Sequence, residues 1–221
     1  MKKIKSRNIV VIIVALIIAG TVAFIVFNSM KAQNNNKAQN ANNDEEKLNY
    51  EKFVKEEKYL KDFTEDFDGI VVFQNKKYAI IDINQDGKLE LIVTANNNAE
   101  TEWFYNEVYT IKDNAVSRID SIYSYGEVRY NSSKRELVYT SVKPTEFVTS
   151  YEFYKLENDQ LKLILTVGKD GGYTDNNGEV LPVIYFTLDE NNKQTNINEE
   201  TEQQLRNDAK ELNYQTADNQ Q

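Results

Sequence analysis

The chain has 221 residues and carries 35 acidic against 26 basic side chains, which gives a formal net charge of −9. It contains neither cysteine nor histidine, which excludes disulfides, thiol chemistry and a lipid-modified N-terminal cysteine, and removes the commonest ligands of transition metals. No basic patch interleaved with aromatic residues occurs in the sequence, so we expect no nucleic acid partner.

Residues 9–27 form an uncharged apolar run that, at about 1.5 Å per residue, can cross about 30 Å of hydrocarbon. The run continues through Phe24 to Phe27, which makes it longer than the apolar region of a cleaved signal peptide and predicts an uncleaved transmembrane signal anchor. Four basic residues precede it: Lys2, Lys3, Lys5 and Arg7. The positive-inside rule then predicts a single-pass protein of the cell membrane, with residues 1–8 cytoplasmic and the C-terminal domain extracellular.

The rest of the chain divides by composition. Residues 28–43 are rich in Asn and Gln and predict a flexible linker, residues 44–214 predict one extracellular domain, and residues 215–221 predict a disordered tail. Without the four N-terminal cations, residues 8–221 hold 22 basic and 35 acidic side chains, a net charge of −13. Such a domain is repelled by anionic lipids and anionic wall polymers, and a divalent cation would offset that repulsion.

The hydrophobic pattern predicts an α+β domain, mostly an antiparallel β-meander with flanking N- and C-terminal helices, preceded by the transmembrane helix. Apolar residues at helical spacing predict helices over 44–63 and 199–212, the second with Asn198 as its N-cap. Alternating short runs between turn residues predict strands over 70–73, 77–82, 89–94, 103–111, 116–123, 127–130, 136–141, 146–156, 161–167 and 180–188.

The segment from Asp82 to Glu90 has oxygen-bearing side chains at positions 1, 3 and 5, a glycine at position 6 and a carboxylate at position 9. That spacing wraps a backbone around one hard cation, and Ca²⁺ suits all-oxygen ligands. The predicted ligands are the side chains of Asp82, Asn84, Asp86 and Glu90 together with the carbonyl of Lys88. The alternative is a plain hairpin in which Asn and Asp side chains bond their own backbone and hold no ion.

The pattern D-x-N-x-D-G-x-x-E, between apolar runs over residues 78–94, resembles the calcium loops of FG-GAP and VCBS-type extracellular β-repeats. It also resembles a form of that loop in small membrane-anchored surface proteins of Gram-positive bacteria. The resemblance implies a calcium-binding loop and an extracellular setting. It does not imply a propeller, because this chain holds one good copy of the motif.

We therefore expect a membrane-anchored extracellular calcium-binding structural or interaction module without enzymatic activity, whose partner is a cell-surface protein or a glycan. An alternative is a carbohydrate- or cell-wall-binding module that uses strand aromatics such as Trp103, Tyr123 and Tyr125, although such rings also form ordinary β-domain cores. A carboxylate-dependent hydrolase is a third hypothesis. Its candidate acids lie on or beside predicted strands: Glu102, Glu107, Glu127, Glu136 and Glu152.

Overall fold

The computed structural model describes residues 39, 41–56, 59–60, 73–96, 103–143, 148–172, 174 and 178–217. The chain divides into two units, Met1–Glu45 and Glu46–Gln221. Of the first unit, residues 39 and 41–45 are described, and they are helical. The predicted transmembrane segment 9–27 and predicted strand residues 70–72 lie outside the described residues. Within the described ranges, no helix combines the length and the apolar character that a membrane span needs.

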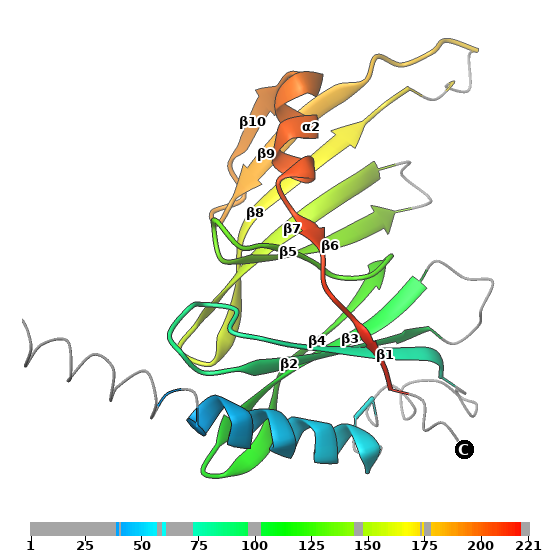
Figure 1. The fold of residues 1–221 in the computed structure, drawn as a ribbon. Helices are drawn as coiled ribbons and strands as arrows, with labels where there is room; N and C mark the ends of the chain where they lie inside the picture. The colour runs from blue at the N-terminus through cyan, green and yellow to red at the C-terminus, as the bar shows by residue number, and fades with distance from the viewer. Residues whose placement is uncertain are drawn as a thin grey trace, which may run out of the picture. The chain divides into compact units, whose positions relative to one another are not determined.

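The second unit contains two antiparallel sheets (Figure 1). The first has the order β12-β1-β2-β3-β4. Its strands are β1 (Gln74–Ile81), β2 (Glu90–Asn96), β3 (Trp103–Lys112), β4 (Ala115–Tyr125) and β12 (Gln215–Thr216). Strands β1 to β4 follow one another as a meander, and the C-terminal strand β12 adds to the free edge of β1.

The second sheet has the order β10-β9-β8-β7-β6-β5-β11. Its strands are β5 (Arg129–Asn131), β6 (Glu136–Lys143), β7 (Val148–Glu157), β8 (Gln160–Asp170), β9 (Ile184–Asp189), β10 (Gln194–Ile197) and β11 (Lys210–Glu211). Every neighbouring pair is antiparallel. The two sheets confirm the α+β class and the antiparallel meander expected from short, closely spaced strands without helices between them.

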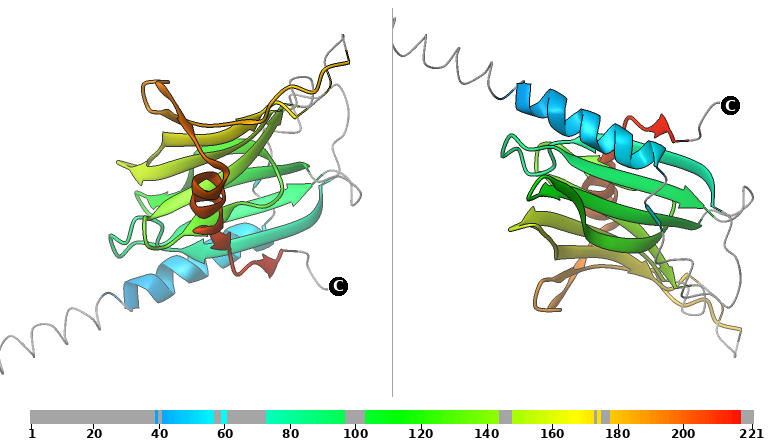
Figure 2. Two further views of the ribbon diagram at one scale, coloured as in Figure 1. Left: turned by 90° about the horizontal axis from the view of Figure 1, so that it is seen from above. Right: turned by 90° about the horizontal axis from the view of Figure 1, so that it is seen from below.

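Alternation along the strands divides the core of this unit into three clusters. Leu91 and Val93 of β2 pack against Tyr50 and Val54 of the helix over residues 41–55. Figure 2 shows residues 46–55 of this helix lying over one face of the first sheet. Ile92 points to the opposite face, where it joins the cluster between the two sheets. The outer face of the second sheet is covered by α2 (Glu199–Asn207) and the residues after it.

Helix α2 begins where the sequence predicts, because the Asn198 side chain accepts a hydrogen bond of 2.8 Å from the N–H of Thr201. Its predicted end at residue 212 is wrong: the helix ends at Asn207, and Lys210 and Glu211 pair with β5 instead. The predicted helix over 44–63 is also too long, because residues 59–60 are bends and Leu60 has a φ of +58°.

The prediction of a disordered tail over 215–221 is wrong for its first residues. Gln215 and Thr216 form β12, and the N–H of Ala217 donates to the carbonyl of Lys76 at 2.8 Å. An edge strand offers unpaired backbone groups, and a polar segment that satisfies them orders itself without a hydrophobic pattern of its own. For this reason the hydrophobic pattern predicts neither β11 nor β12.

Candidate functional site

The predicted ion loop joins β1 to β2 in a hairpin whose last strand pair is Ile81 and Glu90. The loop turns sharply through Gln85 and Gly87, whose φ angles are +59° and +93°. Glycine adopts the second of these without the steric cost that a Cβ atom brings. The backbone therefore curls back on itself inside the segment singled out by the sequence.

Side-chain oxygens of the loop point inward at its own amides. Asp82 accepts from the N–H of Asp86 at 3.1 Å through Oδ1 and from the N–H of Gly87 at 2.9 Å through Oδ2. Asn84 Oδ1 accepts from the same Asp86 N–H at 3.1 Å, and Asp86 Oδ1 accepts from Lys88 N–H at 2.8 Å. The three oxygen-bearing side chains at positions 1, 3 and 5 are thus brought together around one turn.

Glu90, at position 9, is only 2% exposed, and its Oε2 accepts a hydrogen bond of 2.9 Å from the N–H of Ile83. Burial raises the pKa of Glu90 to about 8, and the charges of Asp86, Asp82 and Glu46 act in the same direction. A carboxylate in this position is destabilised by desolvation and by like charges. A cation beside it would oppose both effects.

The helix over 41–55 supplies two contacts to this loop that the sequence did not reveal. Glu46 Oε2 accepts from the N–H of Leu89 at 2.9 Å, and the hydroxyl of Tyr50 donates to the carbonyl of Leu89 at 2.7 Å. Glu46 is 43 residues from Leu89, so no local spacing could have indicated that contact. It brings a fourth carboxylate towards the loop.

Strand β5 and the turn after it contact the other side of the loop. The hydroxyl of Tyr130 donates to the carbonyl of Ile83 at 2.8 Å, and Arg135 Nη1 donates to the carbonyl of Asn84 at 3.1 Å. Gln85 Nε2 reaches the carbonyl of Ser132 at 2.9 Å. The loop is therefore attached to the helix and to the second sheet, and its conformation is linked to both.

The donor chemistry of the loop suits a hard cation, because every candidate ligand is an oxygen. Each carboxylate has about four lone-pair sites, so one hydrogen bond per oxygen leaves capacity for a metal. Among the described residues, however, no three Asp or Glu side chains gather closely enough to form a metal-binding group by themselves. The amide of Asn84 and the carbonyl of Lys88 would have to complete the set. Lys88 is exposed, and its carbonyl remains a predicted ligand.

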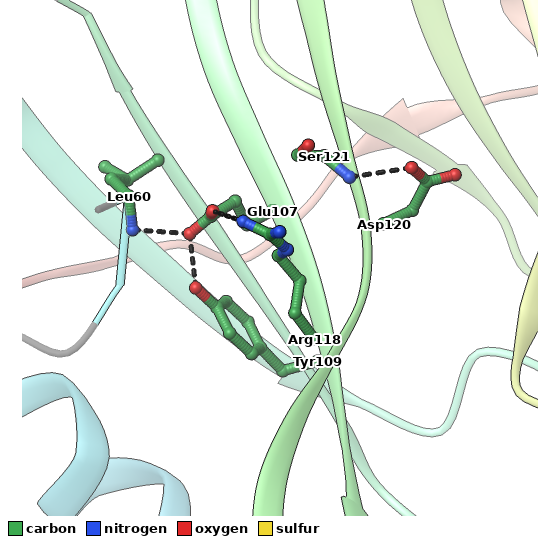
Figure 3. A network of polar contacts seen from close by, with 6 residues as sticks. All are labelled: Leu60, Glu107, Tyr109, Arg118, Asp120 and Ser121. Carbon is green, nitrogen blue, oxygen red and sulfur yellow. Dashed lines mark hydrogen bonds and ion pairs between the residues drawn. The ribbon is translucent and has the colours of Figure 1, made fainter. Parts of the chain in front are cut away.

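A second polar centre surrounds Glu107, one of the candidate acids (Figure 3). Its side chain is buried and accepts hydrogen bonds from the Leu60 N–H and the Tyr109 hydroxyl, while Arg118 Nη1 lies 3.1 Å from Oε1. Burial and the adjacent carboxylate raise the pKa of Tyr109. Through its hydrogen bond with Leu60, Glu107 thus connects β3 to the segment that follows the first helix.

The other candidate acids are spread over both sheets. Glu127 pairs with Lys77 at 2.6 Å, and Glu152 accepts from the Tyr154 hydroxyl at 2.9 Å. Glu136 is buried at the start of β6, and Glu102 lies outside the described residues. The described acids therefore have separate surroundings, on different strands or, for Glu127, in the link between β4 and β5.

The strand aromatics fall into two groups. Tyr105, Tyr109 and Tyr139 are buried in the core, as ordinary β-domain residues are. Tyr123 and Tyr125 are 48% and 36% exposed at the end of β4, and Trp103 of β3 is partly exposed beside them. Which rings face solvent could not be predicted, because it depends on which part of the sheet the helix covers.

No protein-family model matches the chain, and comparison with curated proteins and with solved structures found no significant match.

Proposed function

We propose that the protein is a membrane-anchored extracellular module, without enzymatic activity, whose β1–β2 loop binds Ca²⁺ and thereby rigidifies an interaction surface. In this proposal residues 9–27 are the anchor, and Asp82, Asn84, Asp86, Glu90 and the Lys88 carbonyl are the ligands. The bound ion would supply positive charge that relieves repulsion among these carboxylates. The apolar run and the positive charges before it support the membrane location.

The observation that carries this proposal is the convergence of Asp82 and Asn84 on one amide. Both Oδ1 atoms lie 3.1 Å from the nitrogen of Asp86, so two ligands of the predicted set already share one small volume. A hairpin loop that holds its oxygens together in this way needs little reorganisation to surround an ion. An empty turn would make the same bonds but would gain no stability from calcium, and that difference can be measured.

Calcium at extracellular concentrations suits a site with a Kd of about 10⁻⁴–10⁻³ M. At a calcium concentration of about 100 Kd, the ion would add about 2.7 kcal/mol to the free energy of unfolding. That is a large share of the roughly 5–15 kcal/mol typical of a folded domain. An ion would also stabilise the contacts that the loop makes with Glu46 and Tyr130, because they are made by the same backbone.

The test is thermal unfolding of the full-length chain in a polyoxyethylene detergent, with millimolar calcium and again with a chelator. We expect calcium to raise the Tm of the wild type, and we expect Asp82→Ala and Asp86→Ala to lose most of that rise. Asp189→Ala is the matched control, because Asp189 Oδ1 likewise accepts two backbone N–H bonds in another hairpin loop. It should lower stability while keeping the calcium response. Equal responses in all four proteins would refute the proposed ligands.

A second function, binding of carbohydrate or cell wall, is favoured by the exposed aromatic cluster. The rings of Trp103 and Tyr123 stack at 4.9 Å, and Tyr125 meets Trp103 edge-on at 5.4 Å. Partly exposed rings of this kind offer faces for a sugar to stack on. Cosedimentation of the full-length chain with an insoluble neutral glycan, lost in Trp103→Ala, would support this function.

A further inference from the structure

Leu89 lies between two of the proposed calcium ligands, the Lys88 carbonyl and the Glu90 side chain, and the first helix holds both of its backbone groups. Its N–H donates to Glu46 Oε2 at 2.9 Å, and its carbonyl accepts from the Tyr50 hydroxyl at 2.7 Å. Glu46 and Tyr50 are four residues apart, so they lie on the same face of the helix. One helix face therefore holds the segment that has to present two ligands.

The side chain of Leu89 makes a third contact with the same helix. It is partly buried and packs against the apolar cluster that contains Tyr50 and Val54 of the helix and Leu91 of β2. Tyr50 has no exposed surface, so little water competes for its hydrogen bond. All three contacts exist only while the helix lies on the first sheet.

The bond from Leu89 to Glu46 also fixes the direction of the Lys88 carbonyl. That carbonyl and the Leu89 N–H belong to one peptide unit, which is planar and trans. The two groups of a trans peptide point in opposite directions, so the Lys88 carbonyl points away from Glu46. An acceptor on the N–H also polarises the peptide and makes its carbonyl oxygen more negative. Both effects favour this oxygen as a ligand for a hard cation.

The first half of the loop is held by a different part of the fold. The carbonyls of Ile83 and Asn84 accept hydrogen bonds from Tyr130 and Arg135, which belong to β5 and the turn after it. The proposed ligands before Gly87 are therefore supported by the second sheet, and those after it by the first helix. An ion bound by both halves would favour the folded positions of both supports.

We propose that Glu46 and Tyr50 are positioning residues of the calcium site, and that calcium binding is coupled to docking of the first helix on the first sheet. This inference rests on the calcium-binding function proposed above and assigns its regulation. Coupling between two equilibria is reciprocal, so a docked helix tightens calcium binding and bound calcium holds the helix more firmly. The predicted linker over residues 28–43 leads into this helix in the sequence, so calcium would strengthen the attachment of the first element of the domain.

Tyr50→Phe tests the positioning role without a change of charge. Calcium affinity is measured by isothermal titration calorimetry on the full-length chain in a polyoxyethylene detergent, at a temperature at which near-UV circular dichroism shows each variant to be folded. We expect Tyr50→Phe to weaken calcium binding about threefold or more, because the Leu89 carbonyl loses its donor. Tyr214→Phe is the matched control, since that hydroxyl donates to the Val128 carbonyl at 3.0 Å. It should bind calcium as the wild type does, and equal affinities of the two variants would contradict the proposal.

Glu46→Gln and Glu46→Ala separate the hydrogen bond of Glu46 from its charge. Both substitutions remove the negative charge, but only glutamine keeps an oxygen that can accept from the Leu89 N–H. We expect Glu46→Ala to bind calcium about threefold or more weakly than Glu46→Gln does. Equal affinities would mean that Glu46 acts through its charge alone or binds the ion directly, and would overturn its positioning role.

Hydrogen–deuterium exchange tests the coupling from the side of the helix. We expect calcium to increase the protection of amides over residues 46–55 more than that of amides in α2. Helix α2 is the internal control, because it covers the outer face of the second sheet. In Asp82→Ala the difference should disappear. An equal gain in both helices of the wild type would mean general stabilisation, and the coupling would be refuted.

The outcomes distinguish this inference from the calcium function itself. If the wild type binds no calcium, both are wrong. If the wild type binds calcium and Asp82→Ala does not, while Tyr50→Phe and Glu46→Ala bind as the wild type does, the calcium function stands and the positioning role is wrong.

Discussion

Glu90 is a buried carboxyl group, and its folded pKa of about 8 has a measurable consequence for stability. An unfolded glutamate titrates near 4.3, so between about pH 4 and pH 8 the folded state holds a proton that the unfolded state has lost. The free energy of unfolding should therefore fall as pH rises through this window, by an amount on the order of a few kcal/mol. Chemical denaturation at pH 5, 6.5 and 8 in chelator measures it.

Glu90→Gln provides the comparison, since a glutamine has the same shape, can accept from Ile83 and carries no titrating proton. We expect its stability to depend less on pH than that of the wild type. Glu190→Gln, at an exposed ion pair, should follow the wild-type curve. If the free energy of unfolding depends on pH equally in the wild type and in Glu90→Gln, Glu90 is not the group responsible. Added calcium should reduce the wild-type slope, because a nearby cation favours the ionised form.

Among the elements, the β8–β9 hairpin depends on a glycine for a close approach of two backbones. Gly171 has a φ of +95°, and a Cβ atom there would lie 2.0 Å from the carbonyl oxygen of Pro182. The next residue, Gly172, donates its N–H to Leu181 at 2.9 Å across the same gap. Gly178 has a similar φ of +84°, but a Cβ atom there would meet no atom within 4 Å. Both glycines have a positive φ, but only at Gly171 would a side chain also clash. Comparing the two positions therefore distinguishes the cost of the clash from the cost of the backbone conformation.

We expect Gly171→Ala to destabilise the protein by about 2 kcal/mol or more, because the clash is with backbone that cannot rotate away. Gly178→Ala should cost about 1 kcal/mol, the penalty of a left-handed conformation alone. The stabilities of the two variants are compared through their urea unfolding midpoints, which report stability directly when the m-values are unchanged. A Gly171→Ala variant as stable as Gly178→Ala would mean that the two strands separate easily at this point.

At the scale of the whole unit, the chain's end closes an edge of the first sheet. Gln215 and Thr216 pair with β1, Tyr78 donates its hydroxyl to Gln215 Oε1 at 2.7 Å, and Ala217 is only 8% exposed. Truncation after Tyr214 removes these contacts and exposes the edge of β1. We expect a loss of about 1–3 kcal/mol, from a few hydrogen bonds worth about 0.5–1.5 kcal/mol each.

Truncation after Ala217 is the control, because it keeps all of β12. It should match the full-length chain in urea unfolding, whereas the shorter variant should unfold at lower urea. Identical midpoints for both truncations would mean that β12 contributes nothing to stability in solution.

The sequence by itself determined the local features of this protein. The alternation of apolar residues predicted most strands of both sheets, the spacing from Asp82 to Glu90 predicted a tight oxygen-rich loop, and Asn198 predicted the start of α2. These features depend on residues within a few positions of one another, so backbone geometry and side-chain periodicity are sufficient.

Only the tertiary structure decided what surrounds them. Glu46 and Tyr130 reach the loop from 43 and 47 residues away, and β11 and β12 take their conformation from strands far earlier in the chain. Burial of Tyr109 and exposure of Tyr125 likewise depend on where the first helix covers the sheet. Such contacts form because distant segments satisfy one another's backbone groups and apolar faces, and that choice has no local spacing in the sequence to mark it.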